Sequence, residues 1–285
     1  MDLARIFAPV ADEMKAVDRE LKAVMQSVGV QTAAARGKAG IIDRIVQHPF
    51  EVPGKRIRPA LVLLTARAVG GDLDARSLIA LASSVEILHA ASLVHDDVID
   101  GADSRRHQIS LNKRFGNRVA VLAGDILYTH FFSLITGLTE IDAPKRFSLL
   151  NTFLDTTKSM CTGEILAQEA AAAERPLGFQ EYVEIASDKT AVLFAACCRT
   201  AGLLCEVSAP QLTCLEDFGL QFGLSFQMAD DVVDKDHGLD SRVDLKAAAM
   251  ECAEKARTGI GWLAPGIHRD SLLNLVDYVS ASAIP

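Results

Sequence analysis

The chain has 285 residues, of which 49% are hydrophobic and 23% are charged. This composition excludes an intrinsically disordered protein and allows either one large domain or two small ones. The net charge of −8 argues against a nucleic-acid partner, which needs a basic surface to neutralise phosphates.

Apolar residues recur along nearly the whole chain at helical spacing, and alternating runs of β-branched residues between hairpin turns are missing. The predicted fold class is therefore all-α. No segment rich in Pro, Gly or Ser divides the sequence, so we expect a single domain over residues 1–285.

The N-terminus and the cysteines indicate the compartment. The first residues lack the basic and apolar segments of a signal peptide, and the most apolar stretch, residues 190–205, is interrupted by Arg199 and is too short to span a bilayer. The six cysteines lack zinc-site spacing and are interpreted as buried thiols. We expect a cytoplasmic protein with no transmembrane segment.

Three cations crowd residues 53–59. Lys55, Arg56 and Arg58 follow Gly54 in a predicted loop that runs into a helix. Glycine lets the backbone approach an anion, and the start of a helix adds a positive end. Taken alone, a solvated basic loop is the preferred interpretation.

The next predicted helix leads into an acidic cluster. Glycines at positions 70–71 can end the preceding helix, and Asp74 can cap this one. The helix runs to Asp96-Asp97-Val98-Ile99-Asp100, and Arg105 and Arg106 follow closely enough to share a ligand with the cluster.

The acidic cluster is repeated as Asp230-Asp231-Val232-Val233-Asp234. Positions i and i+4 share a helix face, so Asp96 and Asp100 project together, as do Asp230 and Asp234. Such like charges among apolar neighbours require a cation, and a few oxygen ligands suit Mg²⁺ that is completed by substrate phosphates. One cluster could equally be an acidic helix end, but the pair favours a metal site.

The acidic clusters and basic segments in combination resemble the trans-isoprenyl diphosphate synthase (polyprenyl synthetase) family, from about Gly54 to Asp234. The resemblance implies a helical bundle of the isoprenoid synthase type with a central cavity. It also implies a homodimer. The implied reaction is the head-to-tail condensation of isopentenyl diphosphate with an allylic diphosphate, in which Mg²⁺ assists ionisation of the allylic substrate.

The same resemblance implies roles for individual residues. The implied metal ligands are Asp96, Asp97, Asp100, Asp230, Asp231 and Asp234. The implied contacts to isopentenyl diphosphate are Lys55, Arg58, His89 and Arg106, although His89 without the family would be interpreted as a core histidine. The implied contacts to the allylic diphosphate are Arg105, Lys189, Thr190 and Gln227. The residues expected to act in catalysis are Asp96, Asp97, Asp100, Arg105, Lys189 and Asp230.

Two further pairs, Gly124-Asp125 and Gly163-Glu164, also resemble family signatures, but capping or packing explains them at least as well.

Small residues stand just before the first cluster, where short-chain members of the family often carry aromatic rings. Ala91 and Ser92 therefore predict an open channel and a product longer than farnesyl diphosphate, with Phe131 or Phe132 as its floor. Close helix packing is an equally good explanation for the two small residues.

The sequence departs from the family pattern after Asp234, where the region is expected to be shortened. Lys235 is the one cation expected where a loop normally closes over the allylic diphosphate, and a closing helix is predicted over residues 243–262.

Two alternatives to a synthase therefore stay open. A non-catalytic partner subunit of a heteromeric prenyl synthase would be expected to lose aspartates, and all six are present. A class I terpene cyclase needs no second diphosphate site, so Lys55, Arg58 and Arg106 argue against it.

Overall fold

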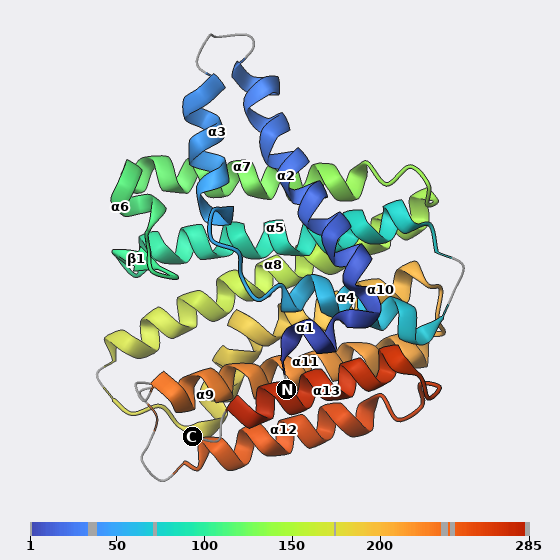
Figure 1. Cartoon of the computed structure of the whole chain (residues 1–285). Coiled ribbons are helices and arrows are strands. Elements are labelled where there is room, and N and C mark those ends of the chain that lie inside the picture. The colour runs from blue at the N-terminus through green and yellow to red at the C-terminus, as the bar shows by residue number, and fades with distance from the viewer. Residues whose placement is uncertain are drawn as a thin grey trace. The chain divides into compact units, whose positions relative to one another are not determined.

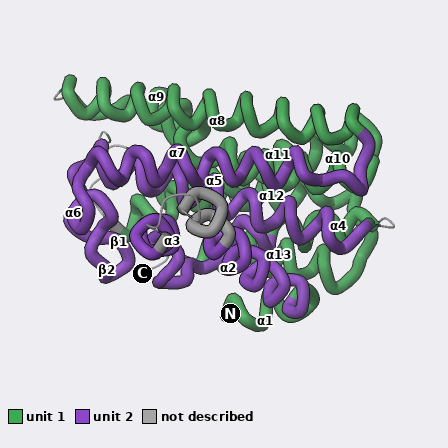
Figure 2. Tube along the Cα trace, turned by 90° about the horizontal axis from the view of Figure 1, so that it is seen from above, with its two compact units in different colours: residues 1–10, 61–73, 143–285 green, residues 11–60, 74–142 purple. Residues whose placement is uncertain are grey.

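The computed structural model describes residues 2–33, 39–70, 73–173, 175–234, 239 and 243–282. Within these ranges nearly all regular structure is helical, which confirms the all-α class (Figure 1). Contacts divide the chain into two compact units, coloured separately in Figure 2. Unit 1 comprises residues 1–10, 61–73 and 143–285, and unit 2 comprises residues 11–60 and 74–142. The single domain over residues 1–285 stays a prediction.

Unit 2 contains two long helices that lie side by side and antiparallel, α5 and α7 (Figure 1). Its elements are α2 (Ala11–Ala33), α3 (Ala39–Gln47), the short helix η2 (His48–Phe50), the first residues of α4 (Ile57–Val69), α5 (Ala75–Ile99), β1 (Ser104–Arg105), β2 (Gln108–Ile109), α6 (Leu111–Phe115) and α7 (Asn117–Thr136).

The predicted boundaries of α5 are confirmed. Gly70 follows α4 with a φ of 76°, a conformation that glycine adopts without strain. Asp74 caps α5, because its carboxylate accepts a hydrogen bond from the Ser77 backbone N–H at 2.8 Å. The helix is then buried almost continuously from Ser77 to Ala91, so it forms the core of unit 2 and delivers the first acidic cluster at its end.

Unit 1 is built around α11, which packs against α10, α12 and α13. Its elements are α1 (Leu3–Ile6), η1 (Ala8–Val10), the rest of α4, α8 (Ala143–Ala172), α9 (Phe179–Ala186), the π-helical turn η3 (Ser187–Ala191), α10 (Val192–Leu204), α11 (Ala209–Asp234), α12 (Leu245–Gly259) and α13 (Ile267–Ser282).

Within the described residues, two helices follow the second acidic cluster. The predicted closing helix is confirmed as α12, whereas α13 was not predicted from the sequence. Lys235, the predicted closing cation, lies outside the described residues.

Two of the described helices, α5 and α7, are long and apolar enough to cross a membrane by length and composition alone. Most of the apolar window of α5 is buried within the structure, as in the core helix of a water-soluble protein, whereas most of that of α7 is not. The absence of a transmembrane segment stays a prediction.

Candidate active site

The first acidic cluster lies at the C-terminal end of α5. Asp100 follows the last helical residue and keeps a helical backbone conformation, with its N–H donating to the Asp96 carbonyl at 2.8 Å. The i and i+4 relationship of Asp96 and Asp100 therefore holds as predicted. Asp96 is partly buried and Asp100 is exposed, so both can reach a ligand at the end of the helix.

Asp97 differs from its two neighbours because it is bound within the protein. Its side chain is buried, and its Oδ1 accepts a hydrogen bond from Arg105 Nε at 2.6 Å. Burial raises the pKa of Asp97, while the Arg105 guanidinium opposes the rise. A charge-assisted bond of this kind contributes about 1.5–3 kcal/mol, so Asp97 anchors the arginine that was predicted to contact the allylic diphosphate.

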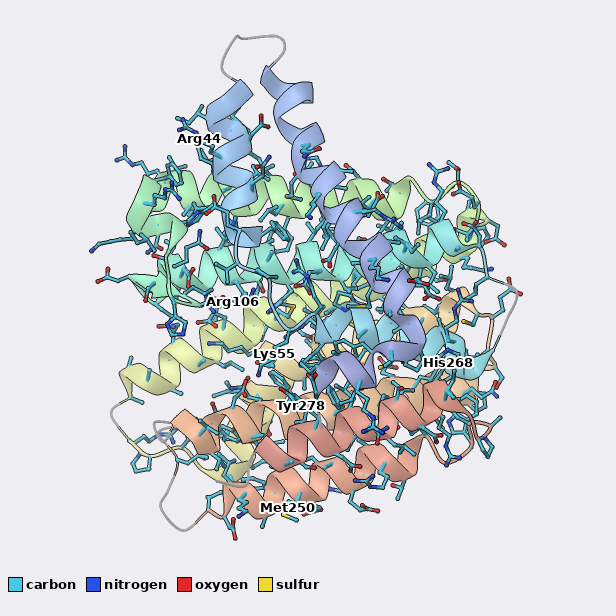
Figure 3. All side chains as sticks on the ribbon, viewed as in Figure 1. Arg44, Lys55, Arg106, Met250, His268 and Tyr278 are labelled. Carbon is cyan, nitrogen blue, oxygen red and sulfur yellow. The ribbon has the colours of Figure 1, made fainter. Side chains whose placement is uncertain are left out.

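Arg106 lies in the turn between β1 and β2 and packs against the basic loop. A Cβ added at Gly54 would lie 2.7 Å from Arg106 Nη1. Gly54 is therefore needed so that the guanidinium can lie over the loop beside Lys55, and Figure 3 labels both cations. Burial lowers the pKa of Arg106, although an arginine stays protonated in proteins.

Arg56 was not assigned a role from the sequence, and the structure gives it a buried partner. Its backbone has a φ of 55°, and its Nη1 donates to Glu86 Oε1 at 2.6 Å. Glu86 is only 5% exposed, so this pair fixes the loop between Gly54 and α4. The signal that sequence reasoning missed is a carboxylate inside the apolar stretch of α5, one turn before His89.

His89 is held neutral by its surroundings. Burial, followed by the charges of Arg58, Arg106, Arg105 and Arg56, keeps the pKa of its imidazole well below the usual range. A neutral imidazole can still donate one hydrogen bond to a phosphate oxygen.

Four predicted residues of unit 2 line one cavity, which we call the arginine cavity. They are His89, Asp97, Arg105 and Arg106, and Arg56 and Glu86 line it as well. Lys55, on the loop, and Arg58, at the start of α4, are not among the residues that line the cavity.

In the second cluster, which lies in unit 1, the middle aspartate is also bound within the protein, but by different partners. Asp231 accepts hydrogen bonds from Tyr182 Oη at 2.5 Å and from Gln227 Nε2 at 3.0 Å. Burial and the neighbouring Asp231 carboxylate raise the pKa of Tyr182, so the phenol stays a donor. Tyr182 was missed from the sequence, because nothing local links it to a residue 49 positions away.

Lys189 and Thr190 lie in the π-helical turn η3, a feature frequent at functional sites. Lys189 Nζ is 2.6 Å from Glu164 Oε2. Burial pushes the pKa of Glu164 up, but Lys189 and Gln168 outweigh it and the pKa is lowered. A Cβ added at Gly163 would lie 2.4 Å from the Lys189 backbone nitrogen, which confirms a packing role for that glycine.

Gly124 also has a packing role. A Cβ there would lie 2.1 Å from His95 Nε2, and that nitrogen donates to the Val121 carbonyl at 3.0 Å. The pair Gly124-Asp125 thus brings α7 close to α5 beside the first cluster.

Four predicted residues of unit 1 also line one cavity, which we call the lysine cavity. Lys189, Thr190, Gln227 and Asp231 line it together with Tyr182 and Arg175. Asp230 is partly buried on α11, and the side chain of Asp234 lies outside the described part of the chain.

The carboxylates fit an ion that takes few protein ligands. Among the described residues, no three His, Cys, Asp or Glu side chains gather closely enough to enclose a metal. With Asp97 bound to Arg105, the first cluster offers the pair Asp96 and Asp100. Mg²⁺ keeps several waters and is completed by substrate phosphates, so this donor set fits it.

Comparisons with known proteins identify the family of the chain. The family model described as Polyprenyl synthetase matches residues 39–241. A prenyl transferase from Synechocystis sp. is 36% identical over 233 residues, 80% of this chain and 66% of that protein. Heptaprenyl diphosphate synthase component 2 from Geobacillus stearothermophilus is 33% identical over 235 residues, 82% of this chain and 67% of that protein. The chain thus spans about two thirds of the length of these relatives.

Solved structures of similar fold cover nearly the whole chain. A decaprenyl diphosphate synthase from Rhodobacter capsulatus has a TM-score of 0.85 at 24% identity and covers 100% of both chains. A polyprenyl synthase from Caulobacter crescentus, solved with calcium and isoprenyl diphosphate, has a TM-score of 0.80 at 24% identity and covers 98% of both chains. At this identity the likeness shows the fold.

Proposed function

Because the chain belongs to the polyprenyl synthetase family, we propose that it condenses isopentenyl diphosphate head-to-tail with an allylic diphosphate. The observation that carries the proposal is the grouping of the predicted residues. In each unit, cations and an internally bound aspartate line one cavity. This pairing suits a diphosphate that must be bound and then stabilised as it leaves.

The proposed isopentenyl diphosphate contacts are the cations around the basic loop, Lys55, Arg58 and Arg106, with His89 as a neutral donor. Arg106 lies over Gly54 next to Lys55, so its fork and the lysine's point charge can bind one anion together. Holding this substrate in one orientation presents its double bond to the allylic carbon, and such positioning accounts for much of the rate.

The proposed allylic diphosphate contacts are Arg105, Lys189, Thr190 and Gln227. The allylic carbon–oxygen bond breaks heterolytically, and Arg105 and Lys189 donate to the diphosphate oxygens as negative charge develops on them. The double bond of isopentenyl diphosphate then attacks the cation. We propose that the released diphosphate removes the final proton, so the chain needs no dedicated basic side chain.

The proposed metal is Mg²⁺, with Asp96 and Asp100 as its proposed ligands in unit 2 and Asp230 as its proposed ligand in unit 1. Mg²⁺ would supply further positive charge to the leaving diphosphate. Its support is the hard oxygen donor set and the calcium in the related Caulobacter crescentus structure. Asp97, Asp231 and Asp234 stay predicted ligands. The hydrogen bonds of Asp97 and Asp231 favour positioning roles for these two.

The proposed product is longer than farnesyl diphosphate. His95 on α5 contacts Gly124 and Tyr128 on the antiparallel helix α7. Ala91 lies one turn before His95 on α5, so it is expected to lie beside the part of α7 that contains Phe131. The ring of Phe131 is fully buried, and we propose it as the floor of a channel that begins at Ala91.

We also propose a cytoplasmic homodimer. The second candidate function is a partner subunit in a heteromeric synthase, which the word "component" in the name of the Geobacillus stearothermophilus relative favours.

Incubating the protein with Mg²⁺, isopentenyl diphosphate and allylic primers of increasing length tests the proposal, with products identified by mass spectrometry. Products that grow by C5 units support the synthase. A cyclic hydrocarbon would show a terpene cyclase instead. Binding of both substrates without turnover would show a partner subunit.

A further inference from the structure

The β1–β2 hairpin carries Arg105 and Arg106 but cannot stabilise itself. It has two paired positions, Ser104 with Ile109 and Arg105 with Gln108, and an isolated two-stranded ribbon is marginal in water. Its turn residues Arg106 and His107 have φ values of 51° and 63°, a left-handed conformation that is unfavourable for residues with a Cβ atom. Contacts from outside the hairpin must therefore hold it.

His48 provides such contacts from η2, ahead of the basic loop. Its side chain is 3% exposed, and its Nε2 lies 2.8 Å from the Ile109 carbonyl oxygen on β2. A carbonyl can only accept a hydrogen bond, so Nε2 carries the proton. The ring thus ties two segments 61 positions apart in the chain.

The other side of the ring is also occupied. Nδ1 lies 3.0 Å from Gln108 Nε2 and 3.2 Å from Arg114 Nη1. Glu51 Oε2 lies 3.2 Å from the same nitrogen and accepts from Gln108. The Phe115 ring meets the imidazole edge-on at 6.1 Å. Both nitrogens of His48 and its ring plane are therefore fixed.

The contacts of His48 join η2, which leads into the basic loop, to the β1–β2 hairpin. The basic loop and the hairpin carry the proposed isopentenyl diphosphate contacts Lys55 and Arg106. Arg106 lies over Gly54 on one side of the arginine cavity, and His48 lines the cavity and connects η2 with β2. Arg105 is anchored separately by Asp97. Loss of the His48 contacts should therefore displace Arg106 more than Arg105.

We propose that His48 is a positioning residue for isopentenyl diphosphate binding, which fixes the Arg106 turn beside Gly54 and Lys55. This inference rests on the proposed function for the identity of the ligand. It differs from a general structural role because it predicts a change in one substrate's affinity rather than a uniform loss of activity.

Three variants test the proposal. His48→Phe keeps a ring against Phe115 and removes both nitrogens, whereas His48→Gln can keep a donor near the position of Nε2. His268→Phe on α13 of unit 1, labelled in Figure 3, is the matched control. Amide hydrogen exchange of residues 104–110 reports the hairpin directly, and calorimetry with isopentenyl diphosphate alone reports its affinity.

The expected result is faster exchange of the hairpin in His48→Phe and a dissociation constant raised about tenfold. The KM for isopentenyl diphosphate should rise in parallel, with kcat and the KM for the allylic primer changed far less. His48→Gln should recover most of the affinity, and the control should match the wild type.

Unchanged hairpin exchange in His48→Phe would overturn the proposal, as would faster exchange with unchanged affinity. If His48→Phe does not fold, judged by its melting temperature, His48→Asn is used, because it keeps a group near Nδ1 and cannot reach Ile109. Failure of the wild type to bind isopentenyl diphosphate would overturn the proposed function. The exchange experiment would still test whether His48 holds the hairpin.

Discussion

The two cavities hold the middle aspartate of their clusters in different ways. In the arginine cavity Asp97 is bound by a charged partner, Arg105. In the lysine cavity Asp231 is bound by two neutral partners, Tyr182 and Gln227. A cation cancels the charge of the aspartate that it binds, whereas a phenol and an amide orient the carboxylate and leave its charge in place. The second cluster therefore keeps more negative charge available for a metal.

Arg105 in the arginine cavity and Lys189 in the lysine cavity also differ in the carboxylate that each of them binds. Lys189 is paired with Glu164 rather than with the aspartate cluster, whereas Arg105 is paired with the cluster itself. With the proposed function, an incoming diphosphate would compete with Asp97 for Arg105 and with Glu164 for Lys189. Substrate binding would then be coupled directly to the acidic cluster in unit 2 and only indirectly to the one in unit 1.

The largest effect is expected from removing a proposed metal ligand of the first acidic cluster, at the end of α5. Asp96→Ala should lower kcat at least about 100-fold, a loss typical for a group that stabilises transition-state charge. Steady-state kinetics with varied Mg²⁺ measure it. Asp103→Ala is the matched control, because its exposed carboxylate pairs with exposed Lys113 and such pairs contribute little. Similar losses in both variants would contradict the proposed role.

A smaller effect is expected when the neutral anchor of Asp231 is removed. Tyr182→Phe leaves Gln227 as the remaining described donor to this carboxylate, and a hydrogen bond to a charged group contributes about 1.5–3 kcal/mol. We expect about a tenfold loss of kcat/KM and a weaker apparent affinity for Mg²⁺, measured by titrating the metal.

Tyr278→Phe on α13 is the control for this variant and should behave as the wild type. An unchanged Mg²⁺ titration in Tyr182→Phe would show that the orientation of Asp231 does not affect metal binding. The difference between the partners of Asp97 and Asp231 would then have no effect on function.

A change beneath the first cluster should alter the product more than the rate. Ala91→Phe places a ring in the proposed channel, so we expect a shorter product by mass spectrometry. Overpacking a buried position destabilises by about 1–3 kcal/mol, so the melting temperature is followed in parallel. Ala80→Phe on the same helix is the control. Products of unchanged length in Ala91→Phe would refute the channel.

The sequence was sufficient for residues whose role depends on local spacing. The helical class, the cap at Asp74 and the shared face of Asp96 and Asp100 all follow from patterns within a few residues. Lys189, Thr190, Gln227 and Asp231 were predicted through the family resemblance, and they line one cavity.

The partners that hold these residues could not be predicted from the sequence. Glu86, Tyr182 and His48 act through residues that are distant in the chain, and a single hydrogen bond between distant positions leaves no periodic signal. The π-helical turn at Lys189 was missed for a related reason. No residue pattern marks the extra residue of such a turn, and the close approach of Gly163 to the Lys189 backbone joins positions that are distant in the chain.

The smallest effect concerns the neutral donor of the arginine cavity. The pKa of His89 in the folded state lies well below its ordinary value of 6.5. When the pH falls below about 6.5, the unfolded chain therefore binds a proton at this histidine that the folded chain does not bind. Unfolding free energy should therefore decrease as the pH falls below about 6.5 and stay constant above it with respect to this group. His89→Gln keeps a hydrogen-bond donor and cannot titrate, so its stability should fall less steeply between pH 6.5 and pH 5. Urea denaturation of both proteins across this range measures the difference, and parallel curves would mean that burial and the surrounding arginines do not hold His89 neutral.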